Sequence, residues 1–541
     1  MTRHTQRTLA RLALLGVSLY LSACQTLPST PHLDKSLKLS QSAKQHIAAQ
    51  AGDELSLSSL VKAHTDAHPK LSGYYPIATG ANAFAARSIL SDMATKTIDV
   101  QYYIWHNDEA GQLMLKDLWE AAQRGVKVRL LLDDMNSSAQ FDQVLLRLAQ
   151  HPNIAVRLIN PMPYRKFRSV NYLTRPKKVN ARMHNKSMTF DNRISVIGGR
   201  NIGNEYLNNT ITSNFADLDV LLVGSVVQDI SQSFESYWSS PLSFDIETLA
   251  KDQNKQLNRL IIPSVFNEFE NSKNASSRER ALRSYRTAMQ DSTIGVDLLQ
   301  KRLPFRWTTI ELFVDPVEKL SNAKDTRTEH IVGKLQRKIG KPNSQFSIIS
   351  SYFVPTKDGV KTLAVLARNG IKINILTNSF DATDVGIVHA GYAHWRNDLL
   401  KSGVNLYEIK STATSVAAEN NKFWRTKSLT STSLHAKAFA IDDRLVFIGS
   451  YNIDPRSANI NTELGVLIHD KQLAEQLHQA LSDHDAMMRQ AYRLKLNPKG
   501  RIEWHTIEHD QPKIYRSEPK TSLSDRAGVV LLSWLPIDWL L

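Results

Sequence analysis

One pattern occurs twice in this chain of 541 residues and constrains its fold more than any other feature. Both copies read His-x-Lys-x4-Asp, and each is followed at the same offsets by a glycine and an asparagine. One copy arises by chance in a chain of this length with odds of roughly a few per cent. Two copies with matching flanks therefore indicate an internal duplication. The first set is His184, Lys186, Asp191, Gly198 and Asn201, and the second is His435, Lys437, Asp442, Gly449 and Asn452.

The segment upstream of each copy predicts the same strand–helix–strand unit. In each unit a strand signal, which alternates between apolar and polar residues in the first half, is followed by a helical stretch that ends at a glycine, and then by a second strand, a buried-strand run in the first half. Such units form parallel sheets, so the sequence predicts an α/β fold with two repeated modules. The predicted ranges are strand 97–104, helix 111–125 and strand 126–132 in the first half, and strand 346–353, helix 358–370 and strand 371–376 in the second.

The motif also predicts where its side chains lie. Because alternate residues share one face of a strand, each histidine and its lysine are expected on the same face. The aspartate is expected at the turn after that strand. The next strand ends in Gly-Gly or Gly-Ser, where the backbone can approach a ligand closely, and an asparagine amide follows. Candidate supporting groups for a phosphate are therefore Gly198, Asn201, Gly449, Ser450 and Asn452.

Paired histidines, lysines and amides suit the chemistry of a phosphodiester. Lysines and amides can stabilise the charge on a five-coordinate phosphorus. One histidine can attack phosphorus and form a phosphohistidine, while the other protonates the leaving oxygen and then deprotonates the incoming alcohol or water. The catalytic candidates are therefore the six motif residues His184, Lys186, Asp191, His435, Lys437 and Asp442.

A carboxylate bonded to each imidazole would fix its tautomer. Asp217, which has Asp219 close by, is the candidate after the first motif, and Glu463 is the candidate after the second. The two motif aspartates have a second interpretation as structural residues that pair with basic groups near the turn. No metal is expected, because His-x-Lys offers a single ligand and the chain lacks a cysteine cluster. A glycine-rich nucleotide loop is also absent from the sequence, so no cofactor is predicted.

The start of the chain resembles a bacterial lipoprotein signal. Three arginines precede an apolar run at 12–21 that is too short to span a membrane permanently. The run ends in Leu-Ser-Ala before Cys24, the only cysteine in the chain. This resemblance implies cleavage before Cys24 and lipid attachment there, and the following Gln25 favours the outer membrane, on the periplasmic side. An ordinary signal peptide with an incidental cysteine is the alternative.

The net charge and the apolar C-terminal segment indicate which class of partner the protein binds. The formal net charge of +15 favours an anionic partner, either nucleic acid or an anionic membrane surface. The apolar residues 527–541 carry Trp534 and Trp539, so they either dock on the protein or contact a membrane interface. The lipoprotein-like start and this tail favour phospholipid substrates and a membrane surface over nucleic acid. No protein partner can be inferred.

Composition divides the chain into segments, with a charged, helix-prone connector between the two halves. The expected segments are a signal peptide at 1–23, a tether with an N-terminal helical part at 24–70, the first half at 71–240, the connector at 241–300, the second half at 301–485, and a C-terminal extension at 486–541.

Residues 75–490 resemble the phospholipase D superfamily, and within it the bacterial cardiolipin synthases, especially those of the C type. The resemblance is carried by TIDVQYYIWHND, RMHNKS, IGGRNIGNEYL, LHAKAFAIDD and the ending LLSWLPIDWLL. It implies a duplicated α/β/α sandwich whose halves share one metal-independent active site, with His184 as nucleophile and His435 as acid and base. It also implies transfer of a phosphatidyl group to the glycerol of phosphatidylglycerol, which gives cardiolipin. Many synthases begin with transmembrane helices, and the lipoprotein-like start departs from that pattern.

Other activities use the same motif. With water as acceptor, a phospholipase D would release phosphatidic acid. A nuclease or phosphodiesterase of the same superfamily would suit the basic charge equally well. A lipoprotein that only binds membrane is opposed by the intact histidines and lysines of both motifs.

Overall fold

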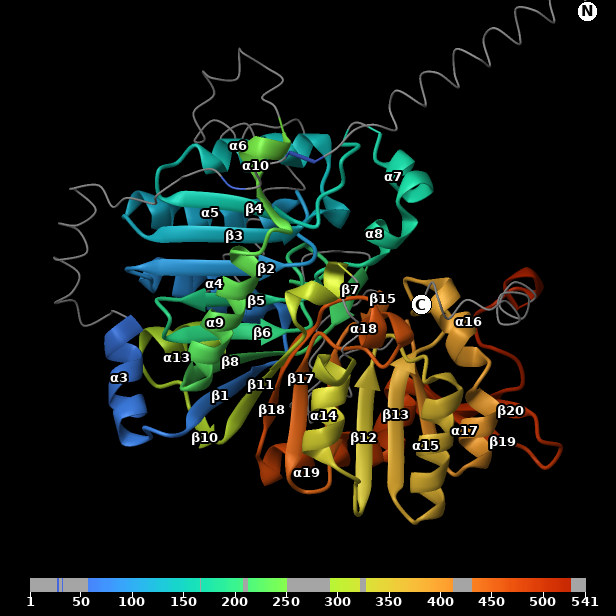
Figure 1. Cartoon of the computed structure of the whole chain (residues 1–541). Coiled ribbons are helices and arrows are strands. Elements are labelled where there is room, and N and C mark those ends of the chain that lie inside the picture. The colour runs from blue at the N-terminus through green and yellow to red at the C-terminus, as the bar shows by residue number, and fades with distance from the viewer. Residues whose placement is uncertain are drawn as a thin grey trace, which may run out of the picture.

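Two large mixed β-sheets, one dominated by each half of the chain, form the computed structural model shown in Figure 1. The structure describes residues 27–28, 32, 57–165, 167–207, 213–250, 292–321, 327–411 and 431–526. Within these residues we find no helix with the length and hydropathy needed to span a bilayer. The predicted lipid attachment at Cys24 and the apolar tail at 527–541 lie outside the described residues.

The first sheet has nine strands in the order β10-β1-β8-β6-β5-β2-β3-β4-β9. Its strands are β1 (Ser72–Ile77), β2 (Thr97–Tyr102), β3 (Lys127–Asp133), β4 (Ile154–Ile159), β5 (Ser187–Phe190), β6 (Ile194–Gly198), β8 (Asp219–Gly224), β9 (Ser243–Asp245) and β10 (Arg306–Thr308). The helices of this half are α3 (Leu57–Ala67), α4 (Gly80–Met93), α5 (Glu109–Gln123), η1 (Asp134–Asn136), α6 (Ala139–Ala149), α7 (Ser169–Thr174), α8 (Pro176–Asn180), α9 (Val226–Trp238), α10 (Ile246–Leu249) and α13 (Thr293–Leu299).

The second sheet has ten strands in the order β11-β18-β17-β16-β12-β13-β14-β19-β20-β21. Its strands are β11 (Ile310–Val314), β12 (Gln345–Ser350), β13 (Lys372–Asn378), β14 (Asn405–Ile409), β16 (Lys437–Ile441), β17 (Leu445–Gly449), β18 (Leu464–Ile468), β19 (Ala491–Leu496), β20 (Ile502–Glu508) and β21 (Gln511–Tyr515). The helices here are η3 (Val317–Ser321), η4 (Arg327–Glu329), α14 (Ile331–Ile339), α15 (Thr356–Arg368), α16 (Gly386–Ala393), α17 (Arg396–Lys401), α18 (Pro455–Asn459), α19 (Lys471–Ser482) and α20 (His484–Gln490).

The predicted duplication is confirmed by the strand pairing. β2 pairs in parallel with β3, and β12 pairs in parallel with β13, as the two strand–helix–strand units predicted. In each half, the strand after the motif histidine pairs in antiparallel orientation with the free side of the first strand of the unit. These pairs are β5 with β2 and β16 with β12. The two motifs therefore occupy equivalent places in two equivalent sheets.

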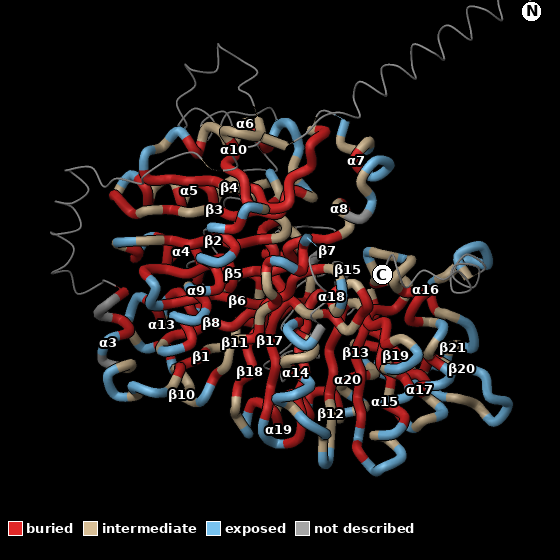
Figure 2. Tube along the Cα trace, in the orientation of Figure 1, coloured by how far each residue is buried: buried red, intermediate tan, exposed pale blue. Residues whose placement is uncertain are grey.

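The apolar core joins the two halves. One cluster of buried side chains combines Leu222 of β8 with Ile448 of β17 and Val466 of β18. Further clusters fill each half separately, and the strands are buried along most of their length (Figure 2). Because each fully buried aliphatic side chain contributes about 1.5–3 kcal/mol, the shared cluster stabilises the contact between halves as well as each half.

The observed strands differ from the expected segment boundaries. β9 and β10 both belong to the first sheet, although the first half was expected to end at residue 240 and the second to begin at 301. β19, β20 and β21 extend the second sheet beyond the expected end at 485. β9 and β10 have only three residues each, too few to show a period, which is why the sequence pattern did not reveal them. Most of the expected connector, residues 251–291, lies outside the described residues.

Candidate active site

The two motifs meet where the sheets adjoin. His184 comes just before β5, and His435 comes just before β16. Both side chains are almost completely buried, and His435 is close enough to be among the groups that lower the pKa of His184. The sequence predicted that each histidine lies within the strand, but each lies a few residues before the strand begins. The lysines follow at the start of, or one residue before, the same strands.

Each histidine pairs with a carboxylate from the opposite half. His184 Nδ1 lies 2.8 Å from Glu463 Oε2, and His435 Nδ1 lies 2.6 Å from Asp217 Oδ2. Both carboxylates had been predicted, but with their own half's histidine, so the assignment of Asp217 to the first motif and Glu463 to the second is wrong. With Nδ1 held in this way, Nε2 of each imidazole is the atom left for chemistry.

The crossing follows from the backbone around the site. The strand before His435, β15 (Ser431–Leu434), pairs in parallel with β7 (Ser213–Ala216), which leads into Asp217. In the same way, the N–H of His184 donates to the carbonyl oxygen of Thr462 at 2.9 Å, directly ahead of Glu463. Each half thus lays its histidine segment against the carboxylate segment of the other half. Sequence periodicity within one half carries no signal for this exchange.

Both lysines are fully buried beside the histidines. Lys186 Nζ donates to the carbonyl oxygen of His184 at 2.7 Å. Lys437 Nζ donates to the carbonyl oxygen of His435 and, at 2.9 Å, to Ser351 Oγ. Lys186 Nζ also lies 5.4 Å from the ring centroid of Tyr103. These contacts hold both lysine side chains close to the motif histidines, as the motif predicted.

The motif aspartates lie at the far ends of the motif strands. Both occupy the left-handed backbone region, with φ of 51° at Asp191 and 48° at Asp442. The Asp191 carboxylate accepts the N–H groups of Thr95 and Lys96 at 3.0 and 2.7 Å. Asp442 does the same for the chain ahead of β12, accepting the N–H of Ser344 at 2.9 Å. Their catalytic assignment is corrected to the structural interpretation, although mainly with backbone amides instead of basic side chains.

The glycines serve the packing of neighbouring strands. A Cβ on Gly198 would meet Asp219 Oδ1 at 2.3 Å, and one on Gly449 would meet the carbonyl oxygen of Leu464 at 2.4 Å. Both glycines therefore make room for the adjacent strand, and the predicted approach to a ligand stays a prediction.

The next position in each half supports a carboxylate of the site. A Cβ on Gly199 would lie 2.1 Å from Asp217 Oδ1, so its absence makes room for that carboxylate. Ser450 Oγ donates to Glu463, and so does Ser457 Oγ at 2.8 Å. Ser450, expected near the phosphate, instead fixes the partner of His184.

The side-chain oxygens of the two asparagines bond to neighbouring loops. Asn201 Oδ1 accepts the N–H of Ile104 at 3.2 Å, and Asn452 Oδ1 accepts the hydroxyl of Ser351 at 2.9 Å. Both oxygens are thus occupied by the loop after β2 or β12. That their amide nitrogens donate to a phosphate oxygen stays a prediction.

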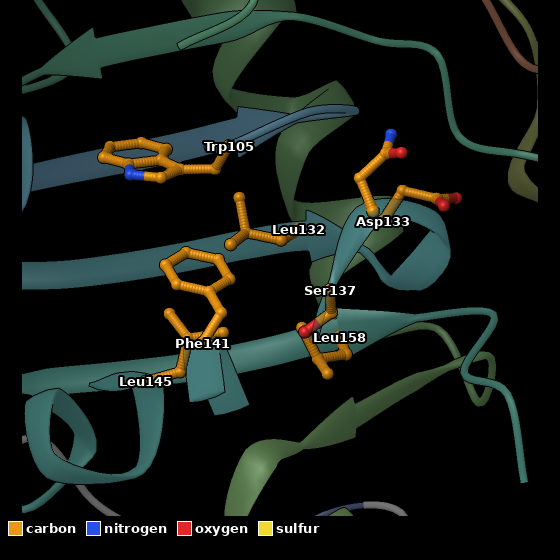
Figure 3. Close-up of a pocket in the computed structure, with 8 residues that line it drawn as sticks. Trp105, Leu132, Asp133, Ser137, Phe141, Leu145 and Leu158 are labelled. Carbon is orange, nitrogen blue, oxygen red and sulfur yellow. The ribbon is translucent and has the colours of Figure 1, made fainter. Parts of the chain in front are cut away.

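Two residues that the sequence reasoning missed fix the chain ahead of each histidine. Asp133, at the end of β3 beside a small pocket (Figure 3), accepts the N–H of Met183 at 2.8 Å. Asn378, at the end of β13, accepts the N–H of Leu434 at 2.8 Å. The sequence did carry a signal for these two residues, because each is a polar residue at the end of the second buried strand of its repeated unit.

The two histidine pairs differ in charge. Burial, followed by Lys186 and Lys437, lowers the pKa of His184 well below its usual value. Burial also raises the pKa of its partner Glu463 to about 7. The pKa of His435 is lowered by burial and Lys437, while Asp217 opposes the shift.

The partner of His435 is ionised. Burial, the largest single influence, raises the pKa of Asp217, but the charge and hydrogen bond of His435 together with the charges of Lys437 and Arg200 outweigh it and lower the pKa to about 2. Burial lowers the pKa of Lys186 to about 7 and that of Lys437 to about 8. The neutral imidazole of His184 suits a nucleophile, and the imidazole beside the ionised Asp217 suits an acid.

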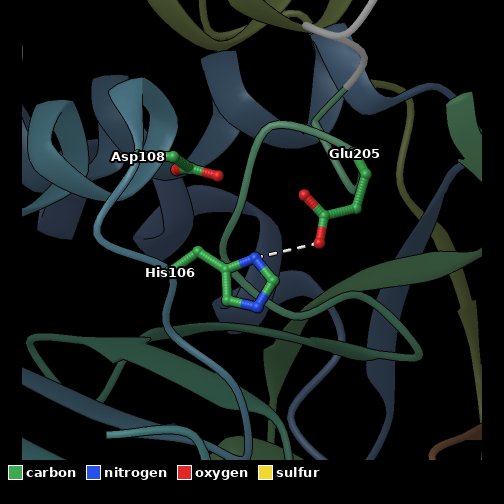
Figure 4. Close-up of side chains that lie close together, drawn as sticks. All are labelled: His106, Asp108 and Glu205. Carbon is green, nitrogen blue, oxygen red and sulfur yellow. Dashed lines mark ion pairs between the residues drawn. The ribbon is translucent and has the colours of Figure 1, made fainter. Parts of the chain in front are cut away.

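One cluster was tested as a metal site. Among the described residues, the ligand atoms of His106, Asp108 and Glu205 lie within 4.8 Å of one another (Figure 4). His106 Nδ1 is 2.9 Å from Glu205 Oε1. The two oxygens of Asp108 accept the N–H groups of Gly111 and Asn204 at 3.0 and 2.8 Å. His106 and Glu205 therefore form an ion pair with each other, and Asp108 caps the start of α5. We assign no metal to this cluster.

Comparison with known proteins agrees with this arrangement. The family model described as "Cardiolipin synthase, PLD-like domain" matches residues 90–238 and 335–484, so each matched segment contains one motif. The chain is 41% identical to cardiolipin synthase C of Escherichia coli K12 over 483 residues, covering 88% of this chain and 97% of that protein. It is 33% identical to a protein of Helicobacter pylori J99 described as uncharacterized, covering 86% of this chain and 89% of that protein.

A solved structure shows the same fold. The crystal structure of phosphatidylserine synthase from Haemophilus influenzae superposes with a TM-score of 0.51 at 15% identity, covering 81% of this chain and 92% of the other. The predicted fold, a duplicated α/β sandwich in which two halves share one site, is confirmed by these matches and by the sheets themselves. The chain belongs to the phospholipase D-like cardiolipin synthase family.

Proposed function

We propose that this chain transfers a phosphatidyl group from one membrane phospholipid to phosphatidylglycerol, which gives cardiolipin, through a phosphohistidine on His184. The observation that carries the proposal is the pair of buried histidines, each bonded at Nδ1 to a carboxylate of the opposite half. The identity of 41% with cardiolipin synthase C supports the substrate class.

In the first step His184 Nε2 attacks the phosphorus of the donor lipid. The new P–N bond forms as the bond from phosphorus to the head-group oxygen breaks. His435 Nε2 gives its proton to that oxygen, so the head-group alcohol leaves neutral. The ionised Asp217 opposes the lowering of the pKa of His435 by burial and Lys437, and so favours the protonated state that this step requires.

In the second step the acceptor replaces the leaving alcohol. The terminal glycerol hydroxyl of phosphatidylglycerol gives its proton to His435 Nε2, and its oxygen attacks phosphorus. The P–N bond breaks, which returns His184 to its neutral form. The product has two phosphatidyl groups joined by one glycerol, and both histidines recover their starting protonation states.

Lys186, Lys437, Asn201 and Asn452 are proposed to hold the nonbridging phosphate oxygens in both steps. Each lysine ammonium lies within hydrogen-bond distance of its histidine's backbone oxygen. Preorganised donors of this kind stabilise the negative charge that develops on a five-coordinate phosphorus.

We further propose that Cys24 anchors the chain on the periplasmic side of the outer membrane. The support is the lipoprotein-like sequence before Cys24 and the Gln25 that follows. Acyl chains at that position would hold the enzyme on a bilayer surface without spanning it.

Mass spectrometry of lipid products tests the activity. Purified protein is supplied with vesicles of phosphatidylglycerol, with and without phosphatidylethanolamine, and the expected product is cardiolipin. Isotope-labelled phosphatidylethanolamine identifies the donor, because its label enters cardiolipin only if it donates the phosphatidyl group. Phosphatidic acid as the sole product would instead establish a hydrolase, and inertness toward all lipids would refute the proposal.

A further inference from the structure

A carboxylate and a phenol hydroxyl meet beside the active site, in the second half of the chain. The Oη atom of Tyr352 lies 2.8 and 3.0 Å from the two carboxylate oxygens of Asp384. Tyr352 is half-buried, whereas Asp384 is exposed. A carboxylate offers about four acceptor positions, so accepting one hydroxyl leaves Asp384 able to accept hydrogen bonds from a ligand.

The two residues come from neighbouring loops of the second sheet. Tyr352 follows β12, and Asp384 follows β13 just ahead of α16. β12 and β13 pair in parallel, and Figure 1 shows both pointing toward β15, which pairs with β7 of the first half. Ligands of α/β sheets bind beyond the carboxyl ends of parallel strands. The tyrosine and the aspartate therefore stand where a ligand of this sheet is expected.

The backbone of Tyr352 is held by the groups that position the second motif lysine. Ser351 Oγ, one residue earlier, accepts the ammonium of Lys437 at 2.9 Å. Asn452 Oδ1 accepts the N–H of Tyr352 at 3.4 Å. The carbonyl oxygen of Tyr352 accepts the hydroxyl of Ser350 at 2.6 Å. The phenol is thus presented from a fixed position in the active site.

Asp384 lies among the groups that surround His435. The ring of Tyr206 is 5.2 Å from the ring of His435. Burial raises the pKa of Tyr206 well above its usual value, and the charge of Asp384 adds to that rise. Burial lowers the pKa of Lys437 to about 8, and Asp384 is one of the carboxylates that oppose this shift. The carboxylate is therefore close to the histidine that handles protons.

The described residues of the first half have no counterpart of this pair. Ile104 occupies the place equivalent to Tyr352, because the N–H of each is accepted by the motif asparagine of its own half. The acidic residues that follow β3, Asp134 and Asp142, are buried in ion pairs with Arg165. The duplication thus repeats the histidines and lysines, whereas the exposed carboxylate belongs to the side of His435.

This side is where the proposed mechanism brings its alcohols. The leaving alcohol takes a proton from His435 in the first step, and the acceptor gives one to it in the second. In phosphatidylglycerol, the attacking primary hydroxyl has a secondary hydroxyl on the next carbon. Water, the competing acceptor, has no second hydroxyl. A carboxylate near His435 can therefore distinguish the two acceptors.

We propose that Asp384, oriented by Tyr352, accepts the secondary hydroxyl of the acceptor's terminal glycerol and so selects a glycerol-bearing lipid. This inference rests on the proposed function, because it names how the same site recognises its acceptor. A hydrogen bond from a hydroxyl to a carboxylate is charge-assisted and is stronger than one between neutral groups. Asp384 is thus a specificity-determining residue that binds the acceptor and takes no proton from it.

A comparison of two acceptors tests the contact. The full-length protein receives a p-nitrophenyl phosphatidyl ester as donor, which has neither an amine nor a glycerol in its head group. The acceptor is either phosphatidylglycerol or an analogue in which 1,3-propanediol replaces the terminal glycerol and the secondary hydroxyl is missing. The unmodified chain is expected to prefer phosphatidylglycerol by at least about tenfold in kcat/KM.

The variant Asp384→Asn is expected to reduce this preference to about threefold or less. The ratio of cardiolipin to phosphatidic acid should fall with it, because water then competes better. Both readouts are ratios within one sample, so the fraction of folded protein does not affect them. Tyr352→Phe, which removes only the orienting hydroxyl, should lose at least about half of the preference, and it decides the question if Asp384→Asn does not fold.

Asp358→Asn on α15 is the matched control. Its side chain is 91% exposed and has an ion pair with Lys361, so the variant removes one surface carboxylate away from the site. This variant should keep the full preference for phosphatidylglycerol.

The inference is overturned if Asp384→Asn keeps the preference of the unmodified chain, or if the unmodified chain uses both acceptors equally well. In either case cardiolipin still forms, so the proposed function stands. Phosphatidic acid as the sole product in the presence of phosphatidylglycerol would refute the proposed function, and the acceptor contact with it.

Discussion

At the scale of single residues, the two histidines owe their different roles to their carboxylates. Glu463 has its pKa raised to about 7 by burial, whereas Asp217 is ionised, because His435, Lys437 and Arg200 together hold its pKa at about 2. The full negative charge therefore lies beside the proposed acid. A nucleophile must be neutral at Nε2 and an acid must be protonated there, and these surroundings favour that division.

The pH profile of Asp217→Asn tests this division and the crossed pairing together. Asp217 favours protonated His435, so its loss should lower the pKa of His435, and the acid should lose its proton at lower pH. The alkaline limb of kcat/KM is expected to move to lower pH by about one unit or more, with a loss in kcat of about 100-fold or greater.

Glu463→Gln is the matched control in the same rate measurements. It alters the partner of His184 and should leave the position of the alkaline limb unchanged while reducing kcat. The reverse pattern, with Glu463→Gln moving that limb and Asp217→Asn leaving it in place, would show that each carboxylate serves the histidine of its own half.

At the scale of strands, Asp191 and Asp442 tie together the elements of each repeat. Each accepts several backbone N–H groups from the chain that enters the neighbouring central strand, β2 or β12. Carboxylates that accept backbone amides in this way stabilise charge-assisted hydrogen bonds worth more than neutral ones. The motif aspartate therefore stabilises the fold of each repeat, and it recurs together with the motif histidine and lysine.

Asp191→Asn separates these two roles. Asparagine tolerates the positive φ of this position but lacks the charge, so the free energy of unfolding should fall by about 2 kcal/mol. Turnover of the folded variant should stay within about threefold of the parent, because no step uses this carboxylate. Denaturant unfolding and kcat check both values. Asp443→Ala, at an exposed position, is the stability control and should change little.

The strands of the two βαβ units could be predicted because buried parallel strands are mostly apolar, as at Val128–Leu132 and Ile373–Leu376, each of which has a single polar residue. The motif residues could be predicted because the repeat marks them. The partner of each histidine could not, because His184 and Glu463 are 279 residues apart and belong to different repeats. The short edge strands β9 and β10 were missed because three residues carry no period.

At the scale of the whole molecule, the site exists only when both halves are in place. The carboxylate of each pair comes from the other half, and one apolar cluster runs through β8, β17 and β18. The two halves are therefore expected to unfold as one cooperative unit and not as two independent domains.

The variant Leu222→Ala tests this cooperativity. Leu222 is fully buried in the shared cluster, so its truncation should reduce the free energy of unfolding by about 2–5 kcal/mol. Hydrogen exchange followed by mass spectrometry should show peptides from both sheets losing protection at the same, lower denaturant concentration. Loss of protection confined to the first sheet would mean that the halves unfold independently.

The central claim is that His184 carries the phosphatidyl group between donor and acceptor, and trapping that intermediate tests it most directly. In the variant His435→Asn, a p-nitrophenyl phosphatidyl ester needs no proton for its leaving group, so the first step can proceed while transfer to the acceptor stalls. Mass spectrometry of peptides kept at alkaline pH should then find the phosphatidyl mass on His184. A phosphatidyl adduct on another residue, or the release of nitrophenol without any adduct, would contradict the account.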